Sequence, residues 1–522
     1  MMDFEARYAS LHRTIHGFQL EIREPMPVIK GNKDYRDMED MLHRIDELLA
    51  QTGVEHEYVV LQLHQHVVDE PDHGQLQATV DRQIRHARRS LRCTVVRMLL
   101  QESYRCLAKH LAESALLRWF CLYDQLGDVR PPSKSTLKRM EEDSPTDLLR
   151  VLNRILCLAS SRTDPETGRS AIDVAEPIDL STIWMDTTCA QLDIHFPTDW
   201  RQVCDGIRSI MTTITTIRRH GLLHRMPDPK QLQSAVNRLS IAMSQASRKG
   251  RGGDKRRERK RTLRSLKRLA RKAIGHAQRY ATLLRQRREA STDLSPAQAR
   301  RLIDRLNHMI ELLPVVVTQA HERIIGSRQV PNGEKIISLY QPHARVYVRG
   351  KSGSDTEFGL QLLLAETREG LIVESALTPE KIASDVDLLL PAVDHLRSEL
   401  GADACTRVVT DRGFASAAND RALRDRGVAS YTMPRSPQRA QERFEEDEAF
   451  APLHRRRSQT EARIGIFKAL FLRDRLPARS RESQDRWVVW ATLAHNLWLL
   501  ARRAVAEAPA DPDEETVAAQ VA

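Results

Sequence analysis

Apolar residues recur every three or four positions through most of the first 160 residues, which is the spacing of amphipathic helices. One such run spans residues 38–49, and a longer run with several breaks spans residues 78–127. Ser133 or Ser135 can cap a further helix. These patterns predict an all-α N-terminal domain over residues 1–175. It serves either packing and dimerisation or the recognition of a DNA sequence, as an end-binding domain.

The pattern changes to that of strands after the loop "SRTDPETGRS". In the segment "PIDLSTIWMDTTCAQLDIHFPTDW", residues 177–200, β-branched and apolar residues lead into Asp186. A second strand-like piece, residues 191–196, stops at Pro197. This arrangement predicts a β-hairpin whose first strand presents Asp186.

From Trp200 to about Gly326 the hydrophobic period is again helical. Asp228-Pro229 and Ser295-Pro296 are signals for a helix cap followed by a first helical residue. Two apolar seams alternate steps of three and four: Leu263, Leu266, Ala270, Ala273, Ala277, Tyr280 and Leu284, then Ile303, Leu306, Ile310, Leu313, Val317, Ala320 and Ile324. They predict an antiparallel helical hairpin within an α-helical insertion over residues 201–329.

Beyond residue 330 strand-like and helical segments alternate. Strands are predicted at 335–340, 344–350, 357–367, 370–377, 406–410 and 428–434, and helices at 385–400, 417–427, around Glu461, and from 485 to 507. Residues 435–453 look polar and irregular. The fold class is therefore mixed α/β and helix-rich, with a domain of residues 176–200 and 330–505 interrupted by the insertion. The acidic tail 506–522 is expected to be disordered.

Three carboxylates stand out in this arrangement. Asp186 lies in the first strand, Asp411 ends a short apolar strand, and Glu461 lies on a late helix. Converging carboxylates repel one another unless a divalent cation neutralises them. Oxygen ligands favour Mg²⁺ or Mn²⁺, and two such ions can activate a water or a 3′-hydroxyl and stabilise the leaving oxygen of a phosphodiester.

The segment around Glu461 also carries cations. Arg457, Glu461 and Lys468 occupy positions i, i+4 and i+11, close to one helical face. Taken alone, Arg and Glu at this spacing form an ordinary solvated ion pair. Cations beside a lone acid can also hold the phosphates that surround a metal site.

The charge of the chain points to an anionic partner. It carries 81 Lys and Arg against 70 Asp and Glu, a formal charge of +11, with a pI near 9.4. Residues 248–289 alone hold 18 basic and 3 acidic residues, a net +15. A solvated coiled-coil face is one interpretation, but such density of one sign favours contacts with DNA phosphates. The candidate contacts are Arg256, Arg257, Arg259, Lys260 and Arg261.

Other classes of protein are disfavoured. The seven cysteines include no C-x-x-C pair, which argues against a zinc site or a disulfide framework and favours a reducing compartment. The N-terminal residues lack the apolar run of a signal peptide, and no window approaches 18 apolar residues. We therefore expect a cytoplasmic protein that does not enter membranes.

Four blocks, in order, resemble those of DDE transposases of bacterial insertion sequences, especially the ISNCY-type and related groups. They are "IWMDTTCAQLDIHFPTD", "VYVRGKSGSDTEFGLQLLL", "VVTDRGFAS", and "SQTEARIGIFK" followed by "LAHNLWLL". The helical segment "LRWFCLYDQLGDVRPPSKSTLKRM" also looks like the one that precedes the catalytic domain in such enzymes. The resemblance covers residues 181–200 and about 335–500.

The resemblance implies an RNase H-like catalytic domain whose acidic triad is Asp186, Asp411 and Glu461, with two Mg²⁺ or Mn²⁺ ions. Part of the group has a tyrosine-arginine-glutamate-lysine signature, in which the Arg and Lys hold phosphates near the cleaved strand. Arg457 and Lys468 match it with Glu461 between them, whereas His454 replaces the tyrosine and is counted with them among the expected DNA contacts. Interruption of the fold by a helical insertion also has precedent in the family.

The implied partners are the element ends and target DNA, bound by a homodimer or higher oligomer at the bacterial nucleoid. Two rivals remain open: another RNase H-like DNA endonuclease, and a transposase-derived DNA-binding protein without activity. Among the neighbouring polar residues, Asp199 and Glu357 are expected to be structural or supporting, and Asp193 to lie on the surface. Arg412 either contacts DNA or pairs with an acid.

Overall fold

The computed structural model describes residues 31–66, 73–123, 129–247, 253–287, 294–351, 354–378 and 384–503. The chain divides into two compact units. The first comprises residues 1–190, 361–379 and 383–522, and the second comprises 191–360 with 380–382. The predicted disordered tail and the Gly-rich stretch at 248–252 lie outside the described residues.

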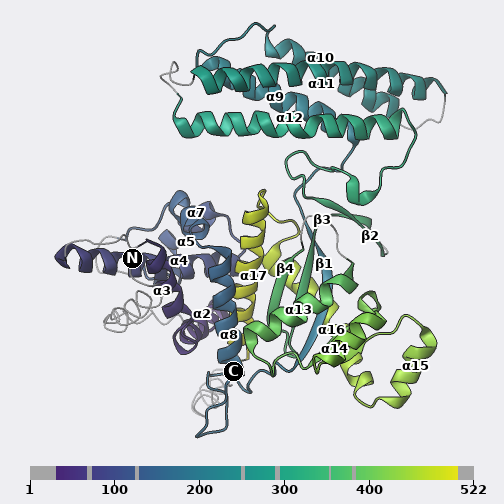
Figure 1. Cartoon of the computed structure of the whole chain (residues 1–522). Helices are drawn as coiled ribbons and strands as arrows, with labels where there is room; N and C mark the ends of the chain where they lie inside the picture. Colours follow the sequence, from purple (N-terminus) through teal and green to yellow (C-terminus); the bar gives the residue numbers. More distant parts are fainter. Residues whose placement is uncertain are drawn as a thin grey trace, which may run out of the picture. The chain divides into compact units, whose positions relative to one another are not determined.

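The first unit begins with a series of helices. They are α2 (Lys33–Gln51), α3 (Val54–His66), α4 (His73–Leu99), α5 (Tyr104–Glu113), α6 (Ala115–Phe120), α7 (Lys134–Glu142) and α8 (Thr146–Ser161). The predicted helical character of this region is confirmed for the residues that the structure describes. Ser133 caps α7 by accepting a hydrogen bond from the Thr136 amide, which settles the choice between the two serines. Helices α2, α4 and α8 pack against α17 (Arg481–Ala501), a mostly buried helix (Figure 1).

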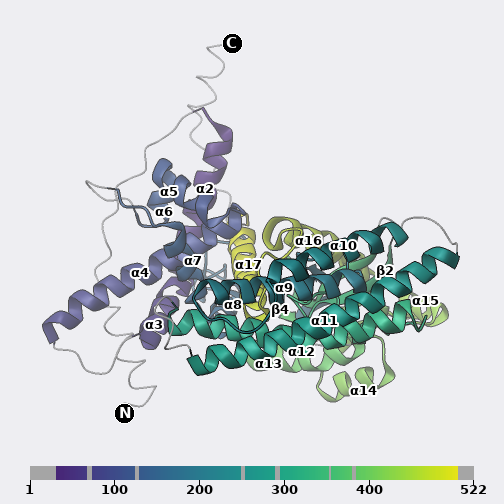
Figure 2. The ribbon, with the colours of Figure 1, turned by 90° about the horizontal axis from the view of Figure 1, so that it is seen from above.

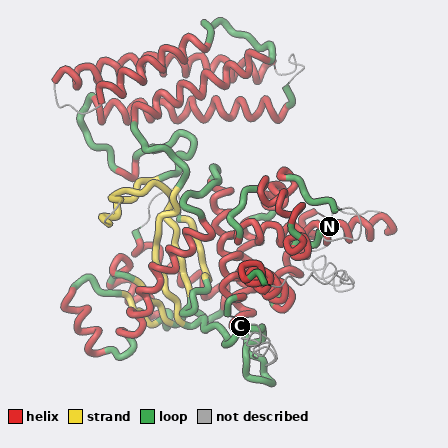
Figure 3. The backbone as a smooth tube through the Cα atoms, turned by 180° about the vertical axis from the view of Figure 1, so that it is seen from behind, coloured by secondary structure: helices red, strands yellow, loops and turns green. Residues whose placement is uncertain are grey.

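The strands of the described residues form one six-stranded sheet (Figure 3). Its strands are β1 (Thr182–Gln191), β2 (Arg345–Lys351), β3 (Ser354–Glu366), β4 (Ile372–Leu377), β5 (Arg407–Thr410) and β6 (Ala429–Thr432). The order is β2-β3-β1-β5-β6, and β4 also pairs with β3. β2 and β4 run antiparallel to β3, whereas β1, β5 and β6 run parallel to one another. The carboxyl ends of these three parallel strands therefore lie at the same edge of the sheet.

Helices and short turns connect the later strands. They are η2 (Asn332–Glu334), α13 (Asp385–Leu400), η3 (Arg412–Phe414), α14 (Ala417–Asp425), α15 (Pro437–Glu446), α16 (Phe450–Phe467) and the π-helical turn η4 (Lys468–Leu472). Gly401 ends α13 with a φ of +105°, a conformation that favours glycine. None of the described helices is both long enough and apolar enough to cross a membrane.

Three local predictions were wrong. Residues 191–196 do not form the second strand of a hairpin: β1 is a single strand, and the chain leaves it for α9. Residues 335–340 form no strand. Ile337 and Leu339 are buried in an irregular segment, whose Ile336 amide donates to the Gln319 side chain. The alternation that suggested a strand is therefore caused by packing. The stretch from 435 to 453 contains α15, which Ser436 caps. α15 buries no residue, so no apolar period marked it in the sequence.

The second unit contains a bundle of four long helices within its described residues. These are α9 (Asp199–Arg219), α10 (Pro229–Ser247), α11 (Gly253–Arg287) and α12 (Pro296–Ile324), which lie side by side (Figure 2). Asp228 accepts from the Lys230 amide, and Ser295 with Gln298 forms a capping box, so both predicted helix starts are confirmed.

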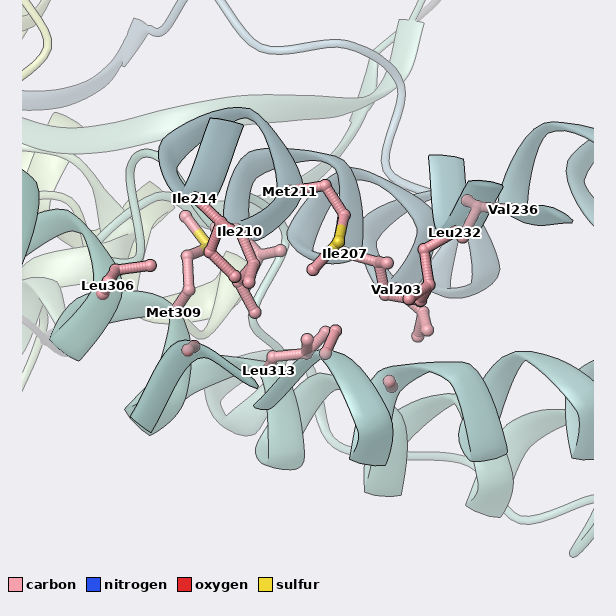
Figure 4. Packing of buried hydrophobic residues seen from close by; sticks show 14 of the residues in the cluster. Val203, Ile207, Ile210, Met211, Ile214, Leu232, Val236, Leu306, Met309 and Leu313 are labelled. Carbon is pink, nitrogen blue, oxygen red and sulfur yellow. The ribbon is translucent and has the colours of Figure 1, made fainter. Parts of the chain in front are cut away.

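The bundle has its own hydrophobic core. Every predicted apolar residue of the α11 seam, from Leu263 to Leu284, is buried. On α12 the burial is shared between predicted seam residues such as Leu313 and unpredicted ones such as Met309. Side chains of α9 point toward those of α12 (Figure 4). A Cβ at Gly206 would lie 2.7 Å from Leu313, so α9 and α12 approach closely there.

Candidate active site

Two of the predicted acids meet where β1 and β5 run parallel. The register pairs Thr182 with Arg407 and Trp184 with Val409, and its continuation by two residues aligns Asp186 with Asp411. Asp186 lies within β1, and Asp411 directly follows β5. The sheet therefore brings together two carboxylates that are more than 200 residues apart in the sequence.

Backbone amides orient both carboxylates. The Thr187 amide donates to Asp186 Oδ1 at 2.8 Å, and the Gly413 amide donates to Asp411 Oδ1 at 2.8 Å. The other oxygen of each acid faces Arg457: Arg457 Nη2 lies 3.2 Å from Asp186 Oδ2 and 3.7 Å from Asp411 Oδ2. One guanidinium nitrogen is thus shared by the two acids.

Helix α16 holds Arg457 in place through its neighbours. Trp184 Nε1 donates to the Leu453 carbonyl at 3.1 Å, which ties the helix to β1. Arg456 pairs with Glu366 at 3.0 Å and lies over the Trp184 ring at 4.6 Å. Because these contacts involve the helical turn that leads into Arg457, the shared cation is fixed from the helix as well as by the acids.

Burial dominates the electrostatics of Asp186, whose side chain is 15% exposed. Loss of solvent raises its pKa from 3.8 to about 6. The Arg457 guanidinium opposes this rise of the pKa, whereas the charges of Asp411 and Glu461 add to it. The acid is therefore poised to exchange a proton close to neutral pH.

Glu461 lies one helical turn after Arg457 and is exposed. It influences the pKa of Asp186 but is not part of the Arg457 ion pairs. Among the residues that the structure describes, no three His, Cys, Asp or Glu side chains stand close enough to hold a metal ion. The structure thus assembles Asp186, Asp411 and Arg457, and leaves Glu461 at longer range.

The two assembled acids fit a divalent cation. Their Oδ2 atoms converge on one positively charged nitrogen, so the position between them favours a cation, and carboxylate oxygens are the donors that Mg²⁺ and Mn²⁺ prefer. Arg457 Nε is buried and has no hydrogen-bond partner among the described residues. An anionic ligand such as a phosphate would satisfy that donor.

The remaining predicted residues of this region have different surroundings. The His454 ring contacts the Phe450 ring at 4.3 Å, and its Nε2 lies 2.9 Å from the Tyr431 carbonyl oxygen. Burial lowers the pKa of His454. Lys468 is half-buried and begins the π-helical turn after α16. Arg412 is exposed in the turn that follows β5.

Sequence analysis missed a further acid, Asp385, in the first turn of α13. Its Oδ1 accepts from Thr187 Oγ1 at 2.9 Å and from Gln361 Nε2 at 3.2 Å. A Cβ built on Gly413 would lie 2.8 Å from Asp385 Oδ2 and 2.9 Å from Asp411 Oδ1. In the sequence, an acid at the start of a helix has an ordinary explanation in the helix dipole, so nothing distinguished it.

The competing polar residues have structural contacts. Asp199 pairs with Arg323 at 2.7 Å and accepts from Gln319, as expected of a structural acid. Glu357 accepts from Gln191 at 3.0 Å. Asn496 is fully buried, and its side chain bonds both the amide and the carbonyl of Ile372.

A second candidate surface, the α11 groove, lies in the helical bundle. It is an open groove of about 580 Å³, lined by Arg261, Arg264, Ser265, Lys267, Arg268, Arg271, His321 and Ile325. Lys267 Nζ lies 3.1 Å from His321 Nδ1 across it. Five basic side chains from one helix therefore border a single groove, where an anion would offset their repulsion.

The predicted DNA-contact residues precede and reach this groove on α11. Arg256, Arg257 and Arg261 are exposed, whereas Arg259 and Lys260 are half-buried. Arg256 donates to Ser327 Oγ at 2.9 Å, and Arg257 lies 3.9 Å from Asp254 on the surface. Arg261 alone of the five lines the groove.

Comparison with known protein families gives a match to part of the chain. Residues 339–497 match the family model described as "Transposase DDE domain". This segment is less than one third of the chain. It contains Asp411 and Glu461, but it begins at residue 339, so Asp186 lies outside it. The match supports a DDE transposase, for which DNA is the partner. Neither the curated proteins nor the solved structures contain a match to the chain.

Proposed function

We propose that this protein is a transposase that binds the terminal repeats of an insertion sequence, hydrolyses phosphodiester bonds at the element ends and joins the 3′-hydroxyl ends to target DNA. The observation that carries the proposal is the convergence of Asp186 and Asp411 on Arg457, with Glu461 one turn further along the same helix. The match of residues 339–497 to a transposase DDE domain supports it independently.

The proposed catalytic domain is RNase H-like and comprises residues 176–200 and 330–505. Its support is the mixed sheet in which Asp186, within β1, lies beside Asp411, which directly follows the adjacent parallel strand β5. The bundle α9–α12 would be the insertion that interrupts this domain at 201–329. The helices within residues 1–175 would recognise the element ends, and the DNA-bound form would be a homodimer or larger.

Asp186, Asp411 and Glu461 would hold two Mg²⁺ or Mn²⁺ ions. When bound, such ions supply an activated water or 3′-hydroxyl and stabilise the leaving oxygen. The contribution of Asp186 requires its ionised form, and its pKa near 6 leaves that form dominant at neutral pH. Glu461 would complete the ligand set, because it lies one helical turn after Arg457 and its charge already influences Asp186.

The cations of α16 would hold the scissile phosphate. Arg457 pairs with both acids through Nη2, while its buried Nε remains available as a donor. Lys468 would contact a flanking phosphate, and Arg412, exposed beside Asp411, another. His454 would support α16 through its bond with Tyr431, in the position where the family signature has tyrosine.

The α11 groove and the basic residues before it would bind the DNA backbone. The five side chains that border the groove present charge without base-specific geometry, which suits sequence-independent contact with phosphates. Arg256, Arg257, Arg259, Lys260 and Arg261 would extend this contact along the helix.

Cleavage of labelled DNA tests the proposal. The substrate is DNA from both flanks of the coding sequence, incubated with the protein and Mg²⁺, and the nicked and joined products are mapped. Asp186→Ala, Asp411→Ala and Glu461→Ala are each expected to reduce cleavage at least ~1,000-fold, because electrostatic stabilisation at such a site is worth several kcal/mol. DNA binding should persist. Asp193→Ala, which removes an exposed acid, is the matched control.

Each rival predicts a distinct result. A related endonuclease would nick DNA but yield no joined product. A protein without activity would bind the ends and leave them intact. Unchanged cleavage in one of the three variants would remove that residue from the site.

A further inference from the structure

Asp385 contacts Thr187, the residue after Asp186, and borders Gly413, which orients Asp411, although it comes from a different element. It is the first residue of α13, a helix whose N-cap residue, Ser384, makes no side-chain capping bond. The start of α13 is tied to α14, because Asn419 Nδ2 donates to the Val386 carbonyl at 2.8 Å. The position of the Asp385 carboxylate is therefore set by the fold around it.

One side of Asp385 reaches the residue next to Asp186. Its Oδ1 accepts from the hydroxyl of Thr187, whose amide in turn donates to Asp186 Oδ1. The same Oδ1 accepts from Gln361, and Gln361 Oε1 accepts from the buried hydroxyl of Thr378. Asp385 and Asp186 are thus joined through a single residue, and β3 supplies a second support.

The other side of Asp385 borders the turn that orients Asp411. Its Oδ2 and Asp411 Oδ1 both lie within 3 Å of the place where a Cβ of residue 413 would stand. The Gly413 amide is the donor that orients Asp411. A side chain at 413 would therefore clash with both carboxylates at once, so glycine is required there for close approach.

We propose that Asp385 is a positioning residue that fixes Thr187 and the Asp411 turn, and through them the two acids of the candidate metal site. The inference rests on the proposed function. The hydrogen bonds from Thr187 and Gln361 hold the half-buried Asp385 carboxylate beside the Asp411 turn, and a group held in this way orients the metal ligands next to it. The alternative explanation is that Asp385 only interacts favourably with the dipole of α13.

The matched control for that alternative is Asp387, an exposed acid in the same turn of α13. Asp385→Ala removes both the charge and the hydrogen-bond acceptor. Asp385→Asn keeps the Oδ1 acceptor for Thr187 and Gln361 and removes the charge. Asp387→Ala removes a charge from the first turn without altering the site.

The test measures Mn²⁺ affinity by calorimetry on the full chain, together with kcat and KM for cleavage of end DNA. Asp385→Ala should weaken Mn²⁺ binding and lower kcat by about 10–100-fold, the usual cost of losing a group that orients metal ligands, with KM for DNA unchanged. Asp385→Asn should recover both quantities to within a few-fold of the wild type. Asp387→Ala should match the wild type.

A double-mutant cycle with Thr187 provides a second test. Thr187→Val should reproduce part of the loss in Mn²⁺ affinity, and the losses from Thr187→Val and Asp385→Ala should be less than additive, because both changes break the same hydrogen bond between these residues. If Asp385→Ala behaves like Asp387→Ala while the wild type cleaves DNA, the positioning role is wrong and the proposed function stands. If the wild type neither binds Mn²⁺ nor cleaves, both proposals fail.

Discussion

At the scale of single residues, Asp186 meets opposing demands. The strand that carries it buries most of its side chain, which favours the protonated form, whereas a metal ligand must be ionised. The Arg457 guanidinium stabilises the ionised form of Asp186, whereas the charges of Asp411 and Glu461 destabilise it. The ionised acid therefore destabilises the fold in the absence of a cation, which is a known cost of functional sites.

Asp186→Asn should stabilise the protein above pH 6. The folded pKa of about 6 exceeds the ordinary 3.8, so between these values the folded state binds more protons than the unfolded state. The free energy of unfolding of the wild type consequently falls as pH rises through this window and stays low above it. A neutral amide avoids the loss, worth up to about 3 kcal/mol for a shift of about two pKa units.

Urea denaturation of both proteins between pH 4 and pH 8, without divalent ions, measures this difference. The gain should grow from near zero at pH 4 to its maximum above pH 6. Asp179→Asn, at an exposed acid before β1, should show no such trend. An equal gain at every pH would mean that the buried charge is not its origin.

The sequence predicted Asp186, Asp411, Arg457 and Glu461 as a group, from strand-like settings and a helical spacing; the structure brings Asp186, Asp411 and Arg457 together and leaves Glu461 at longer range. It was not sufficient for Asp385. The link from Asp385 to Thr187 spans 198 residues, and the donor is an unremarkable hydroxyl within a strand. Such contacts depend on where the first turn of α13 lies relative to the sheet, and no local sequence pattern indicates that position.

At the scale of elements, apolar periodicity was the reliable signal. It predicted α11 and α12, whose seams form the bundle core, and the terminal helix α17. It failed for α15, which has no buried residue, and it wrongly assigned a strand to residues 335–340, where packing rather than pairing causes the alternation. The charge pattern further indicated that the basic face of α11 has an anionic partner. The groove itself could not be predicted, because its lining also includes His321 of α12.

Neutralising the α11 groove should lower the salt dependence of DNA binding. Arg264, Arg268 and Arg271 are exposed and line the groove. Changing all three to Gln should reduce the slope of log K against log salt by up to about 2.7, because each phosphate contact contributes about 0.9. The measurement is fluorescence anisotropy with duplex DNA at several NaCl concentrations.

The control removes equal charge from another part of the same bundle. Arg219, Lys230 and Arg238 are exposed on or beside α9 and α10, and none of them lines the groove. Their triple change to Gln should leave the slope nearly unaltered. If the two triple variants lose the same slope, the contribution is from net charge and not from the groove.

At the scale of the whole molecule, the chain divides into two units whose sequences are interleaved. The helical run between β1 and β2 was visible in the sequence, because no strand pattern interrupts it. The packing of α2, α4 and α8 on α17 was not, since those partners are separated by more than 300 residues and each shows only an apolar face. Each unit has its own buried residues, which provides the basis for separate unfolding.

Calorimetry should therefore resolve two unfolding transitions. Leu266→Ala, in the bundle core, should lower the free energy of unfolding of one transition by about 2–5 kcal/mol, the typical cost of such a cavity. Leu493→Ala, in α17, should lower the free energy of unfolding of the other transition. Mn²⁺ should raise only the transition that Leu493→Ala affects, by about 2.7 kcal/mol at 100 times its Kd, because Asp186, Asp411 and Glu461 all belong to that unit. A single transition that both variants shift equally would show that the units unfold together, and an Mn²⁺ effect on the Leu266→Ala transition would place the ion elsewhere.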